Sequence, residues 1–268
     1  MKRSMGVFVL FMLFLSLMRL AAAETITVAA DPWMPYTGDA QSARQGYCIE
    51  VLKAIFEPAG YTVDYQSHAW TRDVEEVQAG KIDAIVGAGH SDCPRCIFPE
   101  QPIGTIQNLF FVKKGDPWVF NQVSSLAGRR LGVVQGYSYD EGPVDAYIGI
   151  GELPDVQKSS GEKALAFNIQ KLLAGRVDVI VENDHVIANA LKEQVLPEDA
   201  LTPAGKVNEE QAIYIAFSPV SRERTQKMMK VWADGIAALR GSGKLAEILA
   251  RYKIADWAPA VANAPATK

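Results

Sequence analysis

One phrase occurs twice in this chain, first as Ala79-Gly-Lys-Ile-Asp-Ala-Ile-Val86 and again as Ala174-Gly-Arg-Val-Asp-Val-Ile-Val181. Each copy follows a helical pattern of apolar residues, and it reads as a helix end, a capping glycine, a charged turn and a short buried strand. A duplicated unit of this kind predicts two α/β lobes of similar design. Ligands bind beyond the carboxyl ends of parallel strands, which draws attention to residues 87–95 and 182–185.

The segments around the phrase support two comparable lobes. The predicted strand 25–30 runs into the proline-bracketed loop 31–36, and the predicted strand 130–134 runs into 135–139 in the same way. Near the end of the chain, Met228, Trp232 and Ile236 recur at helical spacing, which predicts a long amphipathic helix facing the core. Further strands are expected at 61–65, 108–113 and 210–217, and further helices at 46–56, 124–128, 164–173, 186–192 and 245–252.

Composition limits the classes of partner. The chain has 268 residues, of which 49% are hydrophobic, so it can bury two modest cores. Its net charge is −4, and it has no block of lysine or arginine beyond the extreme N-terminus. This balance argues against nucleic acid and anionic membrane surfaces as partners and favours a small molecule.

The N-terminal segment resembles a secretory signal peptide. Lys2 and Arg3 precede the apolar stretch 7–18, and the small residues 21–23 predict cleavage before Glu24. We therefore expect a signal peptide over 1–23 and a mature protein in the bacterial periplasm, an oxidising compartment. The Ala/Pro-rich segment 259–268 is expected to be a disordered tail.

Three cysteines remain in the expected mature chain: Cys48, Cys93 and Cys96. Cys93 and Cys96 suit a tight disulfide, and Cys48 could instead pair with either of them. The spacing His90-x-x-Cys93-x-x-Cys96 would also allow a metal, but no fourth ligand is evident and the compartment favours a disulfide. We expect a disulfide of undecided pairing, with no metal and no cofactor.

Several phrases together resemble the family 3 extracellular solute-binding proteins, the periplasmic polar amino acid binders of bacterial ABC importers. They are Gly46-Tyr-Cys-Ile-Glu-Val-Leu52, Gly80-Lys-Ile-Asp83 with Arg95 twelve residues after the Asp, Leu126-Ala-Gly128 before Leu131-Gly-Val-Val-Gln-Gly136, Gly175-Arg-Val-Asp178, and 239–249. The likeness runs from about residue 25 to 257. It implies a two-lobed fold in which each lobe is a mostly parallel sheet flanked by helices.

The resemblance also implies how the lobes are divided and connected. The first lobe would comprise 24–106 and 213–258, and the second would comprise 107–212. Crossing segments near 103–109 and 209–213 would form a two-segment hinge, with the ligand in the cleft between the lobes.

Ten residues are candidate ligand contacts, and most of them lie at positions where the resemblance places the binding residues of the family. Trp33 and Trp70 would form aromatic walls, and Arg95 would hold a ligand carboxylate with its guanidinium fork. The turn Gly136-Tyr137-Ser138 would offer backbone N–H groups to an anion. The remaining candidates are Gly87, His90, Glu182 and Asn183.

Two of these positions depart from the family pattern. His90 replaces a hydroxyl residue, and Asn183 stands where the family has its ammonium-binding Asp. An α-ammonium group would lose its charge-assisted partner at Asn183. Two ligands therefore remain open: a carboxylate-bearing compound without the amine, or an amine held by Glu182.

The sequence predicts a binding protein and no enzyme, because no Ser/His/Asp or Cys/His relay and no phosphate loop is evident. We expect a monomer that captures a small polar carboxylate-bearing solute, an amino acid or a related organic acid, for a membrane permease of an ABC importer. One alternative is a periplasmic lyase of the cyclohexadienyl dehydratase type, with Glu182 or His90 as the acid. The other is a ligand-sensing partner of a membrane receptor.

Overall fold

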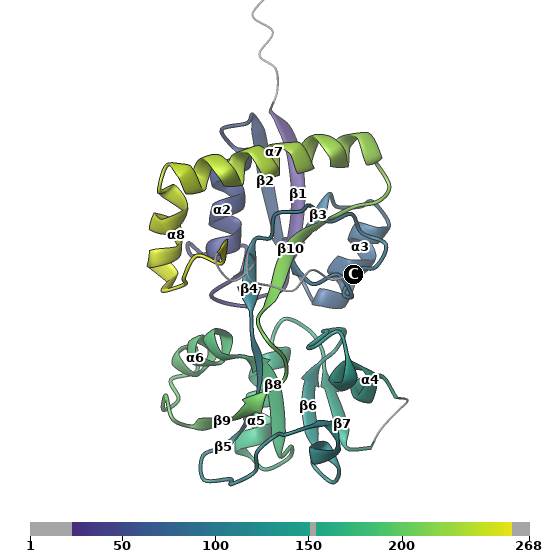
Figure 1. Ribbon diagram of the computed structural model, residues 1–268, viewed down its shortest axis with the longest axis vertical. Helices are drawn as coiled ribbons and strands as arrows, with labels where there is room; N and C mark the ends of the chain where they lie inside the picture. Colours follow the sequence, from purple (N-terminus) through teal and green to yellow (C-terminus); the bar gives the residue numbers. More distant parts are fainter. Residues whose placement is uncertain (1–22, 151–153, 259–268) are drawn as a thin grey trace, which may run out of the picture.

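The computed structural model describes residues 23–150 and 154–258. The predicted signal peptide, apart from Ala23, and the predicted disordered tail lie outside these described residues. Two lobes are stacked along the longest axis of the molecule, and each contains one five-stranded sheet (Figure 1). The two-lobed α/β fold predicted from the repeated phrase is therefore confirmed.

The first sheet has the strand order β2-β1-β3-β10-β4. Strands β1, β2 and β3 pair in parallel, and β10 pairs antiparallel with both β3 and β4. Four strands thus share one direction. The bounds are Glu24–Ala30 (β1), Tyr61–Ser67 (β2), Ala84–Ala88 (β3), Gly104–Ile106 (β4) and Gln211–Phe217 (β10).

The second sheet repeats this arrangement in the order β7-β6-β8-β5-β9. Strands β6, β7 and β8 are parallel, and β5 runs antiparallel to both β8 and β9. The bounds are Asn108–Lys113 (β5), Leu131–Val134 (β6), Val156–Ser159 (β7), Val179–Asn183 (β8) and Leu201–Lys206 (β9).

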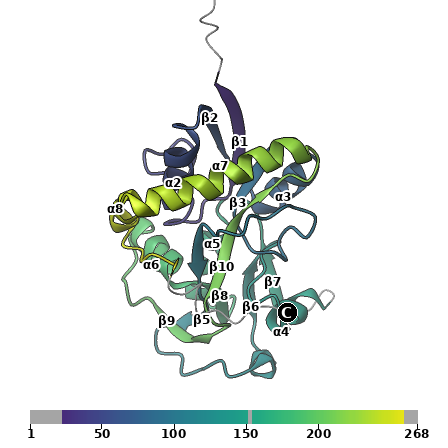
Figure 2. The same ribbon diagram turned by 45° about the horizontal axis from the view of Figure 1, so that its top comes forward.

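Helices cover both sheets. In the first lobe they are α2 (Tyr47–Phe56), α3 (Trp70–Gln78), α7 (Arg222–Gly241) and α8 (Lys244–Tyr252). The second lobe has α4 (Pro143–Gly149), α5 (Ala164–Leu173), α6 (Asp184–Glu193) and the 3₁₀ helix η1 (Val123–Leu126). The long helix α7 crosses the end of the first lobe in both views (Figures 1 and 2) and buries Met228, Trp232 and Ile236, as its periodicity predicts.

Both copies of the phrase follow a helix directly and lead into a central strand, from α3 to β3 and from α5 to β8. The strands read as unbroken apolar runs because both of their faces are covered. In β3, Val86 packs in the cluster that contains α2, whereas Ile85 packs with Val77 of α3. In β8, Val181 and Ile180 likewise belong to opposite clusters.

The chain crosses between the lobes at two points. Gln107 alone separates β4 of the first sheet from β5 of the second, and residues 207–210 lead from β9 back to β10. These positions agree with the crossing segments expected from the resemblance. Figure 1 shows the two connections side by side at the middle of the molecule.

Some elements have no counterpart in the sequence prediction: β4, β7, β9 and α4. These elements are short. Helix α4 begins with Pro143, which suits a first helical position because its ring fixes φ near the helical value. Trp70 is the first residue of α3. Within the described residues, no helix combines the length and apolar character needed to cross a bilayer.

Candidate ligand-binding site

A cavity of about 270 Å³ lies between the lobes. Strand ends and loops of the first lobe form one wall, the β6–α4 loop and the end of β8 form the other, and the strands beside the crossings close the back. The lining residues are Asp31, Trp33, Trp70, Val86, Gly87, Gly89, His90, Asp92, Ile106, Asn108, Tyr137, Ser138, Tyr139, Glu141, Glu182, Gln211, Ala212, Ile213 and Tyr214. Among these described residues four carry carboxylates, and none is a lysine or an arginine.

Glu182 lies at the end of β8, and its residue is only 1% exposed. Its Oε1 accepts hydrogen bonds from Trp33 Nε1 and from the Asn183 backbone N–H, each at 2.9 Å. Its Oε2 is buried without a hydrogen-bond partner among the described residues. Burial is the main cause that raises the pKa of this carboxyl to about 7. The Asp31 carboxylate also raises the pKa, and the two hydrogen bonds lower it.

Asn183 does not line the cavity. Its side-chain oxygen accepts the backbone N–H groups of His185 and Val186, so it is the N-cap of α6. The structure places Asn183 at the helix cap and outside the cavity lining for a physical reason. The first turn of α6 leaves backbone N–H groups without partners, and an Asn at this position satisfies two of them.

Aromatic side chains meet across the cleft. Trp33 and Trp70 of the first lobe both contact Tyr137 of the second edge-on, with ring centroids 6.4 and 6.2 Å apart. Tyr36 stacks behind Trp33 at 4.4 Å and supports it. Trp70 is 6% exposed, and its Nε1 has no acceptor among the described residues. The predicted aromatic walls are therefore present at the cavity.

Polar contacts join the two lobes around the cavity. The Tyr137 hydroxyl donates to Asp31, and the Ser138 backbone N–H donates to Asp92 at 3.2 Å. Ser91 Oγ lies 2.9 Å from Ser138 Oγ and donates to Glu141 at 3.0 Å. Together with the bond from Trp33 to Glu182, these contacts hold the lobes closed on the cavity.

The backbone turn expected to bind an anion is occupied by the protein itself. Asp92 Oδ1 accepts the Ser138 N–H, and its Oδ2 accepts the Gly89 N–H at 2.7 Å. Burial raises the pKa of Asp92 to about 7 despite these bonds. Gly136 does not line the cavity, because it packs against the first lobe: a Cβ there would lie 2.7 Å from Thr71 Cγ2.

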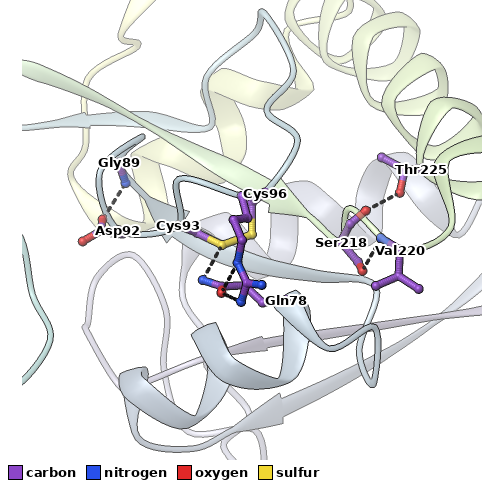
Figure 3. Close-up of a disulfide and its surroundings, with 9 residues drawn as sticks. Gln78, Gly89, Asp92, Cys93, Cys96, Ser218, Val220 and Thr225 are labelled. Atoms are coloured by element: carbon purple, nitrogen blue, oxygen red, sulfur yellow. Dashed lines mark hydrogen bonds between the residues drawn. A yellow bond between two sulfur atoms is a disulfide. The ribbon is translucent and has the colours of Figure 1, made fainter.

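Arg95 also lies outside the cavity lining, contrary to expectation. It is exposed, and its guanidinium donates twice to Gln78 Oε1 at the end of α3, at 2.8 Å from Nε. The Cys93–Cys96 disulfide closes the short loop that carries it, and Gln78 Nε2 donates to Cys93 Sγ at 3.4 Å (Figure 3). Cys93 is fully buried and anchors the loop to α3, and Arg95 in that loop bonds Gln78 and does not line the cavity.

The disulfide resolves the pairing that the sequence left open. Cys48 is a buried free cysteine in α2. His90 packs between Phe98 and Tyr214, with ring centroids 4.5 and 4.7 Å away, at the cavity edge. Across the described residues, no group of three His, Cys, Asp or Glu side chains could hold a metal.

Several lining residues with polar side chains were missed by the sequence reasoning. Asp31 follows the carboxyl end of β1, so the rule that selected residues after β3 and β8 would have found it. Asp92 falls in the stretch 87–95 that the same rule selected, but it was not named as a candidate. Glu141 and Tyr214 carry no such signal.

Comparisons with known proteins were consistent in fold. The family model for bacterial extracellular solute-binding proteins, family 3, matches residues 26–255. A histidine kinase sensor domain similar to periplasmic binding proteins has 22% identity and a TM-score of 0.70 over 86% of this chain and 96% of its own. An ancestral arginine-binding protein bound to arginine has 22% identity and a TM-score of 0.69 over 86% and 99%.

A third solved structure is an ancestral amino acid-binding protein described as a precursor of cyclohexadienyl dehydratase. It has 17% identity and a TM-score of 0.64 over 85% of this chain and 94% of its own. A search of curated protein sequences gave no match. At these identities the structural likeness establishes the fold.

Proposed function

This chain belongs to the bacterial extracellular solute-binding proteins, family 3, and from that membership we propose that it captures one small polar solute in the periplasm by closing its two lobes. It acts as a monomer and delivers the solute to the membrane permease of an ABC importer. The observation that carries the proposal is the 270 Å³ cavity, which is lined by both lobes and bridged by their hydrogen bonds. Its volume is at the small end of ligand pockets, which span roughly 300–1,000 Å³.

Closure follows from differential contact. A ligand in the cavity touches Trp33 and Trp70 on one lobe and Tyr137 and Glu182 on the other only when the lobes are together. A ligand can shift a conformational equilibrium only by its difference in affinity for the two states. Contacts that exist only in the closed state supply that difference.

The ligand charge inferred from the sequence lacks support in the geometry. A carboxylate-bearing solute was expected because of Arg95 and the turn at Ser138. Arg95 bonds Gln78, and the Ser138 N–H bonds Asp92. The lyase alternative meets the same difficulty, because cyclohexadienol substrates are carboxylates and four acidic side chains line the cavity. We therefore favour binding over catalysis.

A thermal-shift screen of the purified protein against amino acids, organic acids and amines tests the proposal. A true ligand at a thousandfold excess over its dissociation constant adds about 4 kcal/mol of stability. The screen is followed by calorimetry on Gly136→Ala and its control Gly128→Ala. Both glycines have positive φ, 85° and 74°, so both variants are strained alike.

Only the methyl group introduced at position 136 meets the opposite lobe, at Thr71, whereas a Cβ at Gly128 meets no atom within 4 Å in the described part of the chain. Forcing a methyl into a packed contact costs about 1–3 kcal/mol, so Gly136→Ala should weaken binding roughly tenfold and Gly128→Ala should not. Failure of every solute to stabilise the protein would overturn the proposal. Deletion that abolishes uptake of the stabilising solute would support delivery over a sensing role.

A further inference from the structure

The charges around the cavity are one-sided. Asp31, Asp92, Glu141 and Glu182 line it, and among the described lining residues the sole side chain that can become cationic is His90. His90 is held between two aromatic rings at the edge. A ligand carboxylate would thus enter a site with four acidic groups and no guanidinium or ammonium to pair with.

One carboxylate oxygen at this cavity, Glu182 Oε2, lacks a hydrogen-bond donor among the described residues. Glu182 Oε1 already accepts two N–H groups, which fixes the orientation of the carboxylate. Oε2 of the same carboxylate is buried with no donor among the described residues, and Glu182 is one of the residues that line the cavity. A buried carboxylate oxygen without a partner is unfavourable, and a ligand N–H bearing positive charge would compensate it most strongly.

The walls suit the rest of such a ligand. Trp33, Trp70 and Tyr137 surround the site with aromatic surface, which attracts cations and excludes water. Trp70 Nε1 is a second buried group without a partner, and it is a donor. It can bond a neutral acceptor on the ligand, such as a hydroxyl oxygen or a ring nitrogen, without any need for a ligand carboxylate.

We propose that the solute is a small organic amine or guanidinium compound that lacks a carboxylate, and that its charged N–H group donates to Glu182 Oε2. This inference rests on the proposed function and names its ligand class. The Tyr137 and Asp31 pair, together with the tryptophans, would then pack around the cationic end.

Three matched pairs of probes test the charge rule by calorimetry at pH 8: agmatine with L-arginine, histamine with L-histidine, and tyramine with L-tyrosine. Within each pair the compounds differ by one carboxylate. We expect at least one amine to bind and to do so at least thirtyfold more tightly than its amino acid. A charge-assisted hydrogen bond and an unpaired buried carboxylate are each large enough for that ratio.

Glu182→Gln provides the site test. The amide oxygen can still accept from Trp33 and Asn183, so the fold is retained while the charge is removed. Amine binding should fall at least thirtyfold. The control Glu193→Gln, at the exposed end of α6, should leave binding unchanged.

Each outcome decides between the two proposals. An amino acid that binds as tightly as its amine, or an amine whose affinity survives Glu182→Gln, overturns the ligand class and leaves the binding function standing. Absence of binding by all three amines also overturns the ligand class. The broader thermal-shift screen then decides the proposed function by itself, since it includes acids and amino acids.

Discussion

The two copies of the repeated phrase build the same scaffold in both lobes. Gly80 and Gly175 follow α3 and α5 with φ of 72° and 69°, and each donates its N–H to the carbonyl three residues earlier. The next residues, Lys81 and Arg176, donate to Glu76 and Lys171, which completes the same capping motif in both lobes.

The aspartates of the two phrase copies, Asp83 and Asp178, also make equivalent contacts. Asp83 accepts the Thr27 backbone N–H at 2.9 Å, and Asp178 accepts the Arg130 backbone N–H at 2.9 Å. Each carboxylate also pairs with an arginine, Arg224 in the first lobe and Arg130 in the second. Each aspartate therefore fastens its central strand to the strand beside it.

The copies diverge at the first residue after the phrase, Gly87 in one lobe and Glu182 in the other. Gly87 leaves room in front of Trp33, since a Cβ there would lie 3.8 Å from the indole ring. Glu182 extends into the cavity and accepts the indole N–H of that same Trp33. The two copies thus share the residues that form the scaffold, whereas the complementary site residues begin where the likeness ends.

Removing the shared aspartates should give the largest effects. Asp83→Ala and Asp178→Ala each leave a backbone N–H and an arginine without their partner, which should lower the free energy of unfolding by about 3–4 kcal/mol. Urea denaturation measures the loss. The control Asp64→Ala, on an exposed position of β2, should change it by less than about 0.5 kcal/mol. A large loss at only one of the two sites would contradict their equivalence.

The divergent residue Glu182 should make the free energy of unfolding depend on pH. Its pKa is raised to about 7 from 4.5. Between pH 4.5 and 7 the Glu182 carboxyl therefore stays protonated in the folded protein, whereas it is ionised in the unfolded chain. The stability that this proton provides is complete below pH 4.5 and is lost as pH rises through 7. Between pH 5 and 8, unliganded Glu182→Gln should therefore gain about 2–3 kcal/mol relative to wild type.

Denaturation across that pH range measures the gain. Asp31, whose pKa burial also raises to about 7, remains in both proteins, so its contribution cancels in the difference apart from its coulombic coupling to Glu182. A difference that stays constant with pH would show that Glu182 is not the buried acid described here. Amine binding should follow the opposite trend and strengthen towards pH 8, because it needs the carboxylate.

Much of the fold could be predicted from the sequence because it depends on local chemistry. The capping glycines and the buried strands carry signals in a few adjacent residues, whereas the crossing segments were inferred from the family resemblance. The strand-end rule drew attention to Gly87 and Glu182, which lie at the carboxyl ends of β3 and β8, whereas Trp33 was assigned through the resemblance. The resemblance assigned Asn183 to the ligand, although capping is the simpler role for a residue directly before a helix.

The remaining site residues depend on contacts between distant segments. Asp92 enters the site because its loop folds back and bonds both Gly89 and Ser138. Glu141 reaches Ser91 only across the closed cleft. No pattern within either lobe specifies these meetings, so the acidic character of the cavity emerged only when the lobes were seen together.

Arg95 tests this distinction with the smallest expected effect. The family spacing assigns it to a ligand carboxylate, whereas the structure shows it exposed and bonded to Gln78. Arg95→Ala should therefore change the free energy of unfolding by less than about 0.5 kcal/mol and the affinity for a stabilising solute by less than twofold. Calorimetry beside Glu182→Gln provides the scale. A tenfold loss would mean that the disulfide loop moves Arg95 into the cleft when the ligand binds, and that spacing along the chain was the better guide.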